Sequence, residues 1–346
     1  MREALKLSVY LGDRDRAAGG LLADALMDSF ELHGLATSAM LRGIEGFGVK
    51  HRLHTERLLT LSEDLPIVAI AVDEAPRIQA ALNDVRALAP HGLITLERAQ
   101  LAELGDAAPD HGGDAHKLTV YVGRGERVEG RAAYAAIVER LHASGMDGAS
   151  VLLGLDGHVG GVRRRARFLH HNAQVPLMII SVGDRHSVNR ALASLLGMGC
   201  EPTVTLERVR VCRRDGVALA DPHEPTQAQG VWQKLSVYAS EQSTHQSRPL
   251  HSALVRRLRE QNAAGVTVLR GLWGYHGDHR PHGERFWSLR RHVPAITVLL
   301  DTPANSRRWF EMVAEMTDEA GLVTSELVPA ARAGGPGIEL GELELS

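Results

Sequence analysis

Apolar and polar residues alternate near the start of the chain in a pattern typical of a β-strand. Leu7, Val9 and Leu11 alternate with Ser8 and Tyr10, which is a period of two. Such a strand has one apolar face and one mixed face. We therefore expect the leucine and valine face to pack on a core, and the serine and tyrosine face to need a different cover.

The residues that follow predict a helix and then four further elements. Apolar residues recur every four positions at Leu22, Leu26 and Phe30, and Gly34 is expected to end this helix. One unit of the chain thus has the order strand, helix, strand, strand, helix, strand. The remaining expected elements are a strand at 37–42, a strand at 67–72, a helix that starts at residue 73 and a strand at 93–99.

This unit occurs three times. The segment Lys6-Leu7-Ser8-Val9-Tyr10 returns at 117–121 and at 234–238, and single glycines, prolines and glutamates keep the same register. The spacing suits a compact domain and is too long for a solenoid repeat. Two stretches rich in turn formers, 103–115 and 214–231, predict linkers. We expect repeats at 1–102, 115–213 and 232–330, followed by a tail at 331–346. The tail could pair as an extra edge strand, but we expect it to be disordered.

The order of elements predicts an α+β fold. Each repeat is expected to be a ferredoxin-like (βαββαβ) domain with both helices on one face of its sheet. The mixed faces that carry Ser8 and Tyr10 would then be left open to water, and three of them can cover one another. We expect a monomeric, intramolecular pseudo-trimer rather than three independent units on linkers.

Composition narrows the classes of function. A net charge of −3 and 4% aromatic residues argue against a nucleic-acid partner. The chain shows no signal peptide and no apolar run of membrane-spanning length, so we expect a soluble, cytoplasmic protein. Cys200 and Cys212 have neither the spacing of a redox pair nor that of a zinc site.

A long insert separates the second and third strands of each repeat and begins with glycines. Hairpins need two to five residues, whereas about twenty follow Gly43, Gly46 and Gly48. Glycines let a backbone approach a ligand, and their amides suit an anion. The alternative is that they end a strand and form a bulge.

Basic residues keep register within the inserts. A histidine or arginine and a second arginine lie three positions apart, so both share one face if the segment is helical, and guanidinium groups bind phosphate or carboxylate. The alternative is a solvated face or a salt bridge. The predicted ligand-binding residues are Arg42, Gly43, Gly46, Gly48, His54, Arg57, Gly154, Gly157, Arg164, Arg167, Arg270, Gly271, Gly274, His282 and Arg285.

Histidine supplies a second hypothesis. His276, His279 and His282 are spaced by three in the third insert and suit a transition metal, although the other repeats have no such triplet. No catalytic constellation, Walker loop or HExxH motif is present, so we predict no catalytic residues and no enzyme.

The first repeat resembles the PII signalling proteins, and more closely the bacterial family known as domain of unknown function 190. The resemblance rests on Leu41-Arg42-Gly43-Ile44-Glu45-Gly46-Phe47-Gly48, on His54-Thr55 and on Leu61-Ser62-Glu63-Asp64-Leu65-Pro66. It implies a ferredoxin-like fold, trimeric assembly, a loop between strands two and three that contacts partner proteins, and adenine nucleotides in clefts between subunits. The lysine that PII proteins carry before the last strand has no match here. Family association also suggests a membrane transporter or fluoride channel as a partner.

These observations predict a non-enzymatic, PII-like sensor or regulator. A small anionic ligand, with an adenine nucleotide as a candidate and no certain cofactor, would bind between repeats and set the conformation of the inserts. The alternatives are a metal-binding protein of the copper-tolerance type and a structural scaffold without a ligand.

Overall fold

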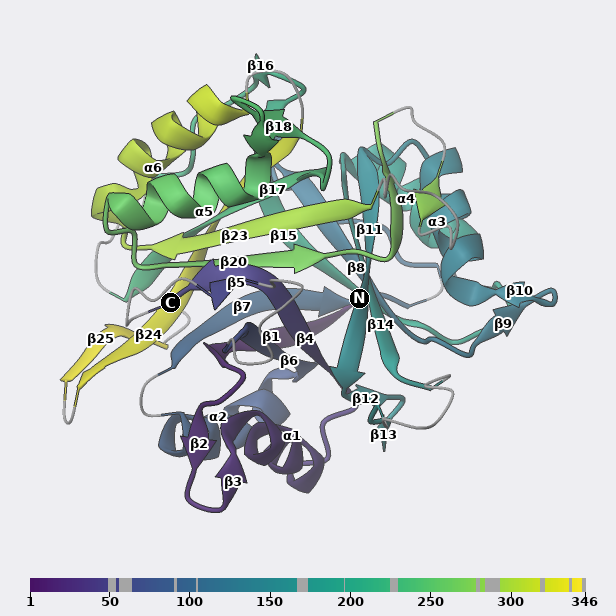
Figure 1. Cartoon of the computed structure of the whole chain (residues 1–346). Coiled ribbons are helices and arrows are strands. Elements are labelled where there is room, and N and C mark those ends of the chain that lie inside the picture. Colours follow the sequence, from purple (N-terminus) through teal and green to yellow (C-terminus); the bar gives the residue numbers. More distant parts are fainter. Residues whose placement is uncertain are drawn as a thin grey trace.

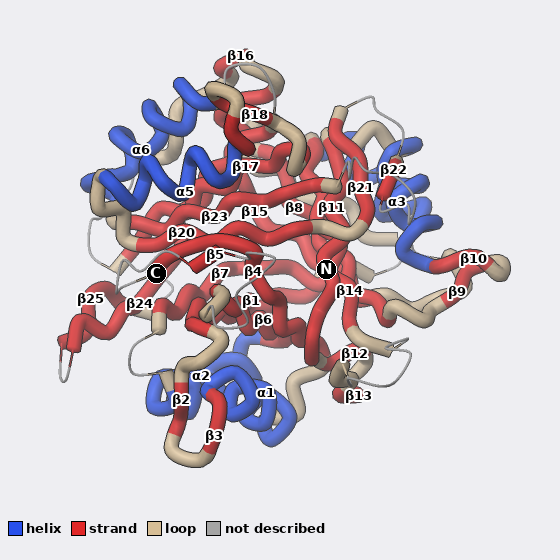
Figure 2. The backbone as a smooth tube through the Cα atoms, viewed as in Figure 1, coloured by secondary structure: helices blue, strands red, loops and turns tan. Residues whose placement is uncertain are grey.

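The structure is a computed structural model of the chain. It describes residues 1–48, 54–55, 64–89, 92–103, 105–166, 174–195, 197–224, 230–277, 281–283, 293–317, 321–335 and 338–343. Strands occupy the middle of the molecule and helices lie at its periphery (Figures 1 and 2).

The local elements of the first repeat agree with the periodicity of the sequence. The expected strand around Leu7 is part of an 11-residue strand, and the expected first helix begins at Leu22 and ends before Gly34. The second strand is longer than expected and continues through the first glycines to Phe47. The main elements are β1 (Arg2–Gly12), α1 (Leu22–Leu32), β4 (Thr37–Phe47), β6 (Pro66–Glu74), α2 (Ala75–Leu88) and β7 (Leu93–Leu101).

The second and third repeats place similar elements in the same order. In repeat 2 these are β8 (Ala115–Gly123), α3 (Ala133–Ala143), β11 (Gly148–Asp156), β14 (Pro176–Gly183), α4 (Arg185–Leu195) and β15 (Thr203–Arg214). In repeat 3 they are β17 (Val231–Ser240), α5 (Leu250–Glu260), β20 (Gly265–Arg270), β21 (Trp273–His276), β23 (Pro294–Asp301), α6 (Pro303–Met316) and β24 (Leu322–Gly335). Short strands complete the set: β2 (Arg16–Ala17), β3 (Gly20–Leu21), β5 (His54–Thr55), β9 (Arg127–Val128), β10 (Arg131–Ala132), β12 (His158–Val159), β13 (Val162–Arg163), β16 (Val217–Ala218), β18 (Thr244–His245), β19 (Arg248–Pro249), β22 (His282–Gly283) and β25 (Ile338–Glu342).

The expected fold class, three ferredoxin-like α+β domains packed as an intramolecular pseudo-trimer, is wrong. The strands do not form three separate sheets, because they join one sheet of 17 strands. This antiparallel sheet closes on itself: hydrogen-bonded neighbours run from β4 through β6, β1, β7, β24, β17, β23 and β20 back to β4. We call it the closed sheet.

Edge strands explain the difference. A separate four-stranded sheet would leave two edges with unpaired N–H and C=O groups. Instead, the last strands β7, β15 and β24 pair with one another, and the second strands pair in the same way through β4–β20, β4–β11 and β11–β21. The period of two in a sequence predicts a strand but not the partner of its edge, so the pattern did not reveal this continuity.

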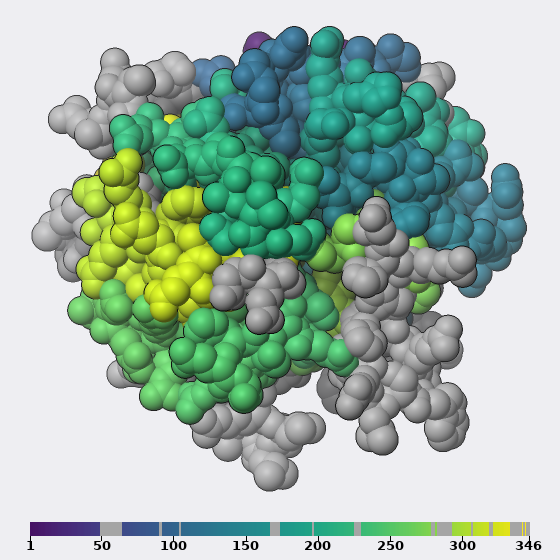
Figure 3. Space-filling view, turned by 90° about the horizontal axis from the view of Figure 1, so that it is seen from above, coloured from purple at the N-terminus to yellow at the C-terminus, as the bar shows by residue number. Residues whose placement is uncertain are grey.

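Among the described residues, four large apolar clusters and a small one of Val182, Val209 and Leu322 form the core. Three lie between the helices and the outer face of the closed sheet, one for each repeat, and include Leu26, Ile137 and Leu254. The fourth contains residues of all three repeats, such as Tyr121 and Trp232, and fills the inner face. Seen from above, the surfaces of repeats 2 and 3 meet side by side (Figure 3).

The C-terminal tail is ordered where the structure describes it, so the expectation of disorder is wrong. Strand β25 pairs with the end of β24, with Ala331 opposite Gly341. The hairpin extends beside the C-terminus at one end of the molecule (Figure 1). Among the described residues, no helix has the length and apolar character needed to cross a membrane.

Candidate functional site

Six charged side chains meet inside the closed sheet. Three lysines lie on β1, β8 and β17, the first strand of each repeat, and three glutamates lie on β7, β15 and β24, the last strand of each. All six residues are buried, with exposed fractions of 3% to 6%. In each repeat the lysine stands opposite the glutamate in the strand register. The pairs are Lys6 with Glu97, Lys117 with Glu207 and Lys234 with Glu326, and we call the six residues the ion ring.

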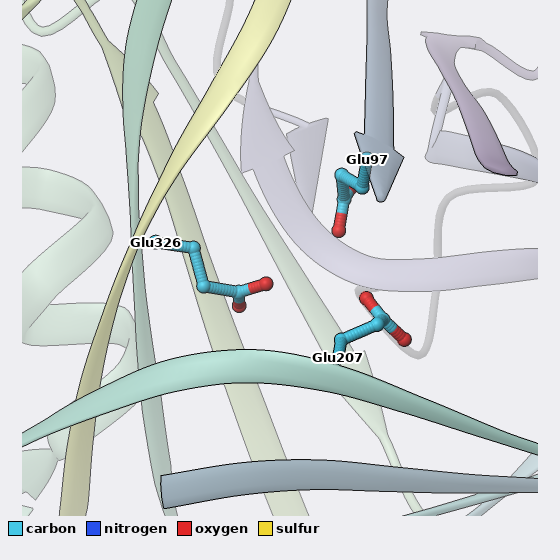
Figure 4. Close-up of side chains that lie close together, drawn as sticks. All are labelled: Glu97, Glu207 and Glu326. Atoms are coloured by element: carbon cyan, nitrogen blue, oxygen red, sulfur yellow. The ribbon is translucent and has the colours of Figure 1, made fainter. Parts of the chain in front are cut away.

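Each lysine of the ion ring contacts the glutamate of its own repeat and the glutamate of the next repeat. Charges of opposite sign therefore alternate around a closed circuit that links all three repeats. Figure 4 shows the three carboxylates converging from different strands. Lys6 Nζ lies 3.3 Å from Glu97 and 2.7 Å from Glu207, Lys117 Nζ lies 2.8 Å from Glu207 and 2.5 Å from Glu326, and Lys234 Nζ lies 3.6 Å from Glu326 and 2.7 Å from Glu97.

Mutual attraction keeps the ring charged despite its burial. Burial alone would raise the pKa of the Glu97 carboxyl, but the three surrounding lysines outweigh it and hold that pKa well below its usual value. Burial likewise opposes the charge of Lys117, yet the neighbouring carboxylates raise the pKa of Lys117 well above the usual value. For Lys234 burial is the larger effect and lowers its pKa, in line with the longer contact to Glu326.

A cavity of about 40 Å³ adjoins the lysine side of the ion ring, and we call it the central cavity. Its apolar walls come from the second and third strands of the repeats, for example Leu41, Val68 and Met178. Its polar lining includes the three ring lysines, Ser8, Ser236, Tyr10 and Tyr238.

The three ring glutamates also approach one another closely enough to suggest a metal site. Their oxygens lie within 4.8 Å of one another, the one such grouping among the described residues. The three ammonium groups already neutralise these carboxylates at contact distances. The geometry is therefore that of an ion-pair network.

The recurring glycines lie where one repeat joins the next. A Cβ atom on Gly43 would lie 2.9 Å from the Val268 carbonyl oxygen, and one on Gly46 would lie 2.4 Å from the Val266 oxygen. Both glycines therefore allow β4 to approach β20. The register between these strands shifts beside Gly43, as a bulge would produce, but β4 continues to Phe47 and does not end at the glycines. A Cβ on Gly157 would likewise lie 2.2 Å from the Ser38 oxygen, and one on Gly274 would lie 2.1 Å from the Ala149 oxygen, both in a neighbouring repeat. The nearest atoms to a Cβ on Gly154 and Gly271 belong instead to prolines of the same repeat, at 2.7 Å for Pro176 and 2.6 Å for Pro294.

Gly48 differs from these glycines, because nothing lies within 4 Å of an added Cβ. It is exposed and ends the described part of the first insert before residue 54. No close packing accounts for this glycine, and its role as a ligand-binding residue stays a prediction.

Two predicted cations form salt bridges instead of pointing at a common site. Arg42 Nη2 lies 2.9 Å from Asp13 Oδ2, and Arg270 Nη2 lies 2.6 Å from Glu241 Oε1. Arg164 is half-buried, and its backbone N–H donates to the carbonyl of Gly157 at 2.7 Å. Its guanidinium makes no ion pair within the described residues, so Arg164 is the predicted cation best placed to meet a ligand.

Of the remaining predicted site residues, the structure describes three histidines. His54 and His282 belong to the short strands β5 and β22, where their backbones pair with Gly46 and Gly274. His276 Nε2 lies 2.7 Å from Asp215 Oδ1. Arg57, Arg167, Arg285 and His279 lie outside the described residues.

The junction between repeats 1 and 2 holds a network that sequence reasoning missed. Arg163 Nη2 lies 2.9 Å from the buried carboxylate of Asp156, and its Nη1 reaches Asp28 at 2.6 Å on α1. Ser38 and His158 join the same two repeats through a 2.7 Å hydrogen bond. Neither contact recurs among the described residues of the other repeats, so the threefold pattern did not reveal them.

The junction between repeats 2 and 3 contains a small cavity of about 20 Å³. Asp147, Ser181, Tyr275 and His276 line it. Asp147 also forms an ion pair of 2.5 Å with Arg214. The cavity thus touches the base of the third insert and two strands of the neighbouring repeat.

Sequence reasoning also overlooked the ion ring, although a signal was present. The chain contains four lysines among its 39 basic residues, and three of them are Lys6, Lys117 and Lys234. A composition so rich in arginine makes each lysine conspicuous. Their strict register with three glutamates at the last strands completes the signal.

Comparisons with known proteins give one family and its members. The family model DUF190, described as "Uncharacterized ACR, COG1993", matches residues 4–101, 115–211 and 232–330. A UPF0166 protein of Aquifex aeolicus (strain VF5) is 25% identical over 92 residues, which are 27% of this chain and 86% of the relative. A second UPF0166 protein of the same organism is 32% identical over 82 residues, 24% of this chain and 84% of the relative. Each of these relatives has about the length of one repeat.

Proposed function

Because this chain belongs to the DUF190 family, with three copies in tandem, we propose that it is a non-enzymatic regulator that binds a small anionic ligand at the junctions between repeats. The ligand sets the conformation of the long inserts, and a partner protein recognises that conformation. An adenine nucleotide is the first candidate ligand, and a membrane transporter or channel is the first candidate partner.

One observation carries this proposal: the base of each insert is hydrogen-bonded to a strand of the neighbouring repeat. The base of the first insert pairs with β20, that of the second with β4, and that of the third with β11. A ligand at a junction therefore contacts two repeats and the start of an insert together. Such a ligand shifts the insert only by binding one of its conformations more tightly than the other.

The three junctions are not equivalent. The junction of repeats 1 and 2 carries the available guanidinium of Arg164, and its neighbours Arg163 and Arg165 are held by acidic residues of α1. The junction of repeats 2 and 3 carries the 20 Å³ cavity with His276 at its edge. We expect one or two ligands for each chain rather than three.

Isothermal titration calorimetry of the full chain tests the proposal with ATP, ADP, AMP and cyclic dinucleotides as separate titrants. Thermal unfolding provides a second readout, since a ligand at a hundredfold excess over its Kd stabilises by about 2.7 kcal/mol. The Arg164→Ala variant should lose one binding site. The matched control Arg165→Ala, whose side chain is 54% exposed and pairs with Asp24, should keep it.

Two results would contradict the proposal. The first is the absence of heat and of a thermal shift with every titrant. The second is an unchanged number of sites in Arg164→Ala, which would remove the junction of repeats 1 and 2 as a ligand site. A purified candidate channel that binds the chain equally with and without nucleotide would reject the signalling step alone.

A further inference from the structure

We infer that the central cavity is a second ligand site, which binds a monovalent inorganic anion such as chloride or nitrate. This site lies inside the closed sheet and is distinct from the junctions. Anion binding in the central cavity therefore does not depend on ligand binding at the junctions.

The lining of the central cavity favours negative charge. Lys6, Lys117 and Lys234 line it, whereas none of the ring glutamates does. Although the ion ring is neutral as a whole, the cavity faces its positive side, and in a buried environment this arrangement of charges is weakly screened.

The hydrogen-bond donors of the ring lysines also favour an anion in the cavity. Three ammonium groups supply nine N–H donors and no acceptor. The hydrogen bonds to glutamates and the 2.8 Å contact of Lys117 with Glu207 use about five of them. About four N–H groups therefore remain. An anion in the cavity can accept hydrogen bonds from those that face it, in competition with the hydroxyl oxygens of the lining and with Glu207 Oε1 and Glu326 Oε1, which are buried without a partner among the described residues.

The hydroxyl groups of the lining can also donate. Ser8 and Ser236 present rotatable O–H groups, and Tyr238 keeps its proton because burial raises its pKa to about 12. No carboxylate or side-chain amide lines the cavity. The side chains of the lining thus offer ammonium and hydroxyl donors, and their only acceptors are hydroxyl oxygens, which suits an anion.

Size restricts the ligand. One water molecule needs about 10–15 Å³ of such volume, so a cavity of about 40 Å³ holds one halide or nitrate ion with a water molecule or two. A nucleotide is too large. A divalent anion would place two charges beside a ring that is neutral overall, which disfavours sulfate and hydrogen phosphate.

Two measurements on the full chain test this inference. The first is a bromide soak of crystals, which should give an anomalous peak within hydrogen-bonding distance of the ring lysines. The second is thermal unfolding at constant ionic strength, with chloride, bromide or nitrate replacing gluconate. We expect a saturable rise of Tm with the small anions. Gluconate should give no such rise, because it is too large for the central cavity.

Variants separate anion binding from general salt effects. Lys234→Met should abolish both signals but carries a risk of misfolding. Ser236→Val keeps all six ring charges, removes one hydroxyl and fills part of the cavity, and should weaken the bromide signal at least tenfold. The exposed substitution Arg256→Met is the control and should change neither signal.

Three outcomes would overturn the inference. They are ordered water without a bromide peak, a crystal peak without a saturable thermal effect (binding at crystal concentration only), and identical bromide responses of the wild type and Ser236→Val. None of them affects the titrations at the junctions.

Discussion

Lys117 is the position where removal of one charge should be most damaging. It contacts all three ring glutamates, at 2.8 Å for Glu207, 2.5 Å for Glu326 and 3.7 Å for Glu97, and 3% of its side chain is exposed. Lys117→Met keeps most of the volume but leaves three buried carboxylates facing two ammonium groups. Breaking a buried ion pair on one side costs about 3–5 kcal/mol. That is a large part of the 5–15 kcal/mol that is typical of a folded domain.

The assay is urea unfolding of Lys117→Met and of wild type, followed by circular dichroism at two pH values. One carboxylate without a counter-charge has a raised pKa in the folded state, so it takes up a proton on folding as the pH falls. The deficit in unfolding free energy should therefore be smaller near pH 5 than near pH 8.

A second variant separates charge from packing. In Lys117→Met/Glu326→Gln the numbers of positive and negative ring charges are equal again. We expect it to recover more than half of the lost free energy. The exposed Arg256→Met, which breaks an i,i+4 pair on α5, should cost no more than about 0.5 kcal/mol. A Lys117→Met protein as stable as wild type at both pH values, or a double variant weaker than the single one, would refute the ring as a balanced network.

Three further predictions follow from single contacts. Gly46→Ala should lower the thermal midpoint by several degrees because its Cβ would meet a backbone carbonyl at 2.4 Å, whereas Gly48→Ala should leave it unchanged; equal midpoints would contradict the close-approach argument. His116 is fully buried, and this burial lowers its pKa to about 4, so the folded protein favours the neutral imidazole. The stability that neutral His116 contributes is fully present above about pH 6.5 and is lost as the pH falls toward 4. Urea titrations of His116→Leu should show a flatter profile over that range, and an unaltered profile would exclude this residue as the cause. Arg163→Ala should cost about 2–3 kcal/mol in chemical unfolding, because the buried Asp156 carboxylate would keep the longer 3.8 Å contact with Arg165 but lose its closer partner. Arg165→Ala should cost less than about 1 kcal/mol, and the reverse order would show that exposure is not decisive.

Local patterns predicted the elements well, since a period of two or of 3.6 depends only on neighbouring residues. The strand around Leu7 and the helix from Leu22 agree with the structure. The recurring prolines and glycines also have a shared cause: Pro66 packs against Gly43, and the equivalent pairs in the other repeats do the same. These marks could be aligned from sequence without knowing that they contact each other.

The closed sheet could not be predicted in the same way. The partner of an edge strand depends on residues more than a hundred positions away, as between β4 and β20. The lysine of Lys6-Leu7-Ser8-Val9-Tyr10 was interpreted as part of a strand motif, because charge inside a core is rare and only three-dimensional proximity to Glu207 explains it. Arg42 and Arg270 pair with Asp13 and Glu241, and a sequence does not show which acidic residue a surface arginine meets. Their role in ligand binding stays a prediction.

The circuit of alternating charges has a consequence for how such a gene can evolve. A substitution at any of the six positions of the ion ring alters contacts in at least two repeats. A change of charge at one position therefore requires a compensating change at another. The inserts contain none of the six ring residues, so a substitution there does not change the charge balance of the ion ring. Three copies in one chain can therefore carry three different inserts. An assembly of identical subunits, encoded by one copy, would carry the same insert three times.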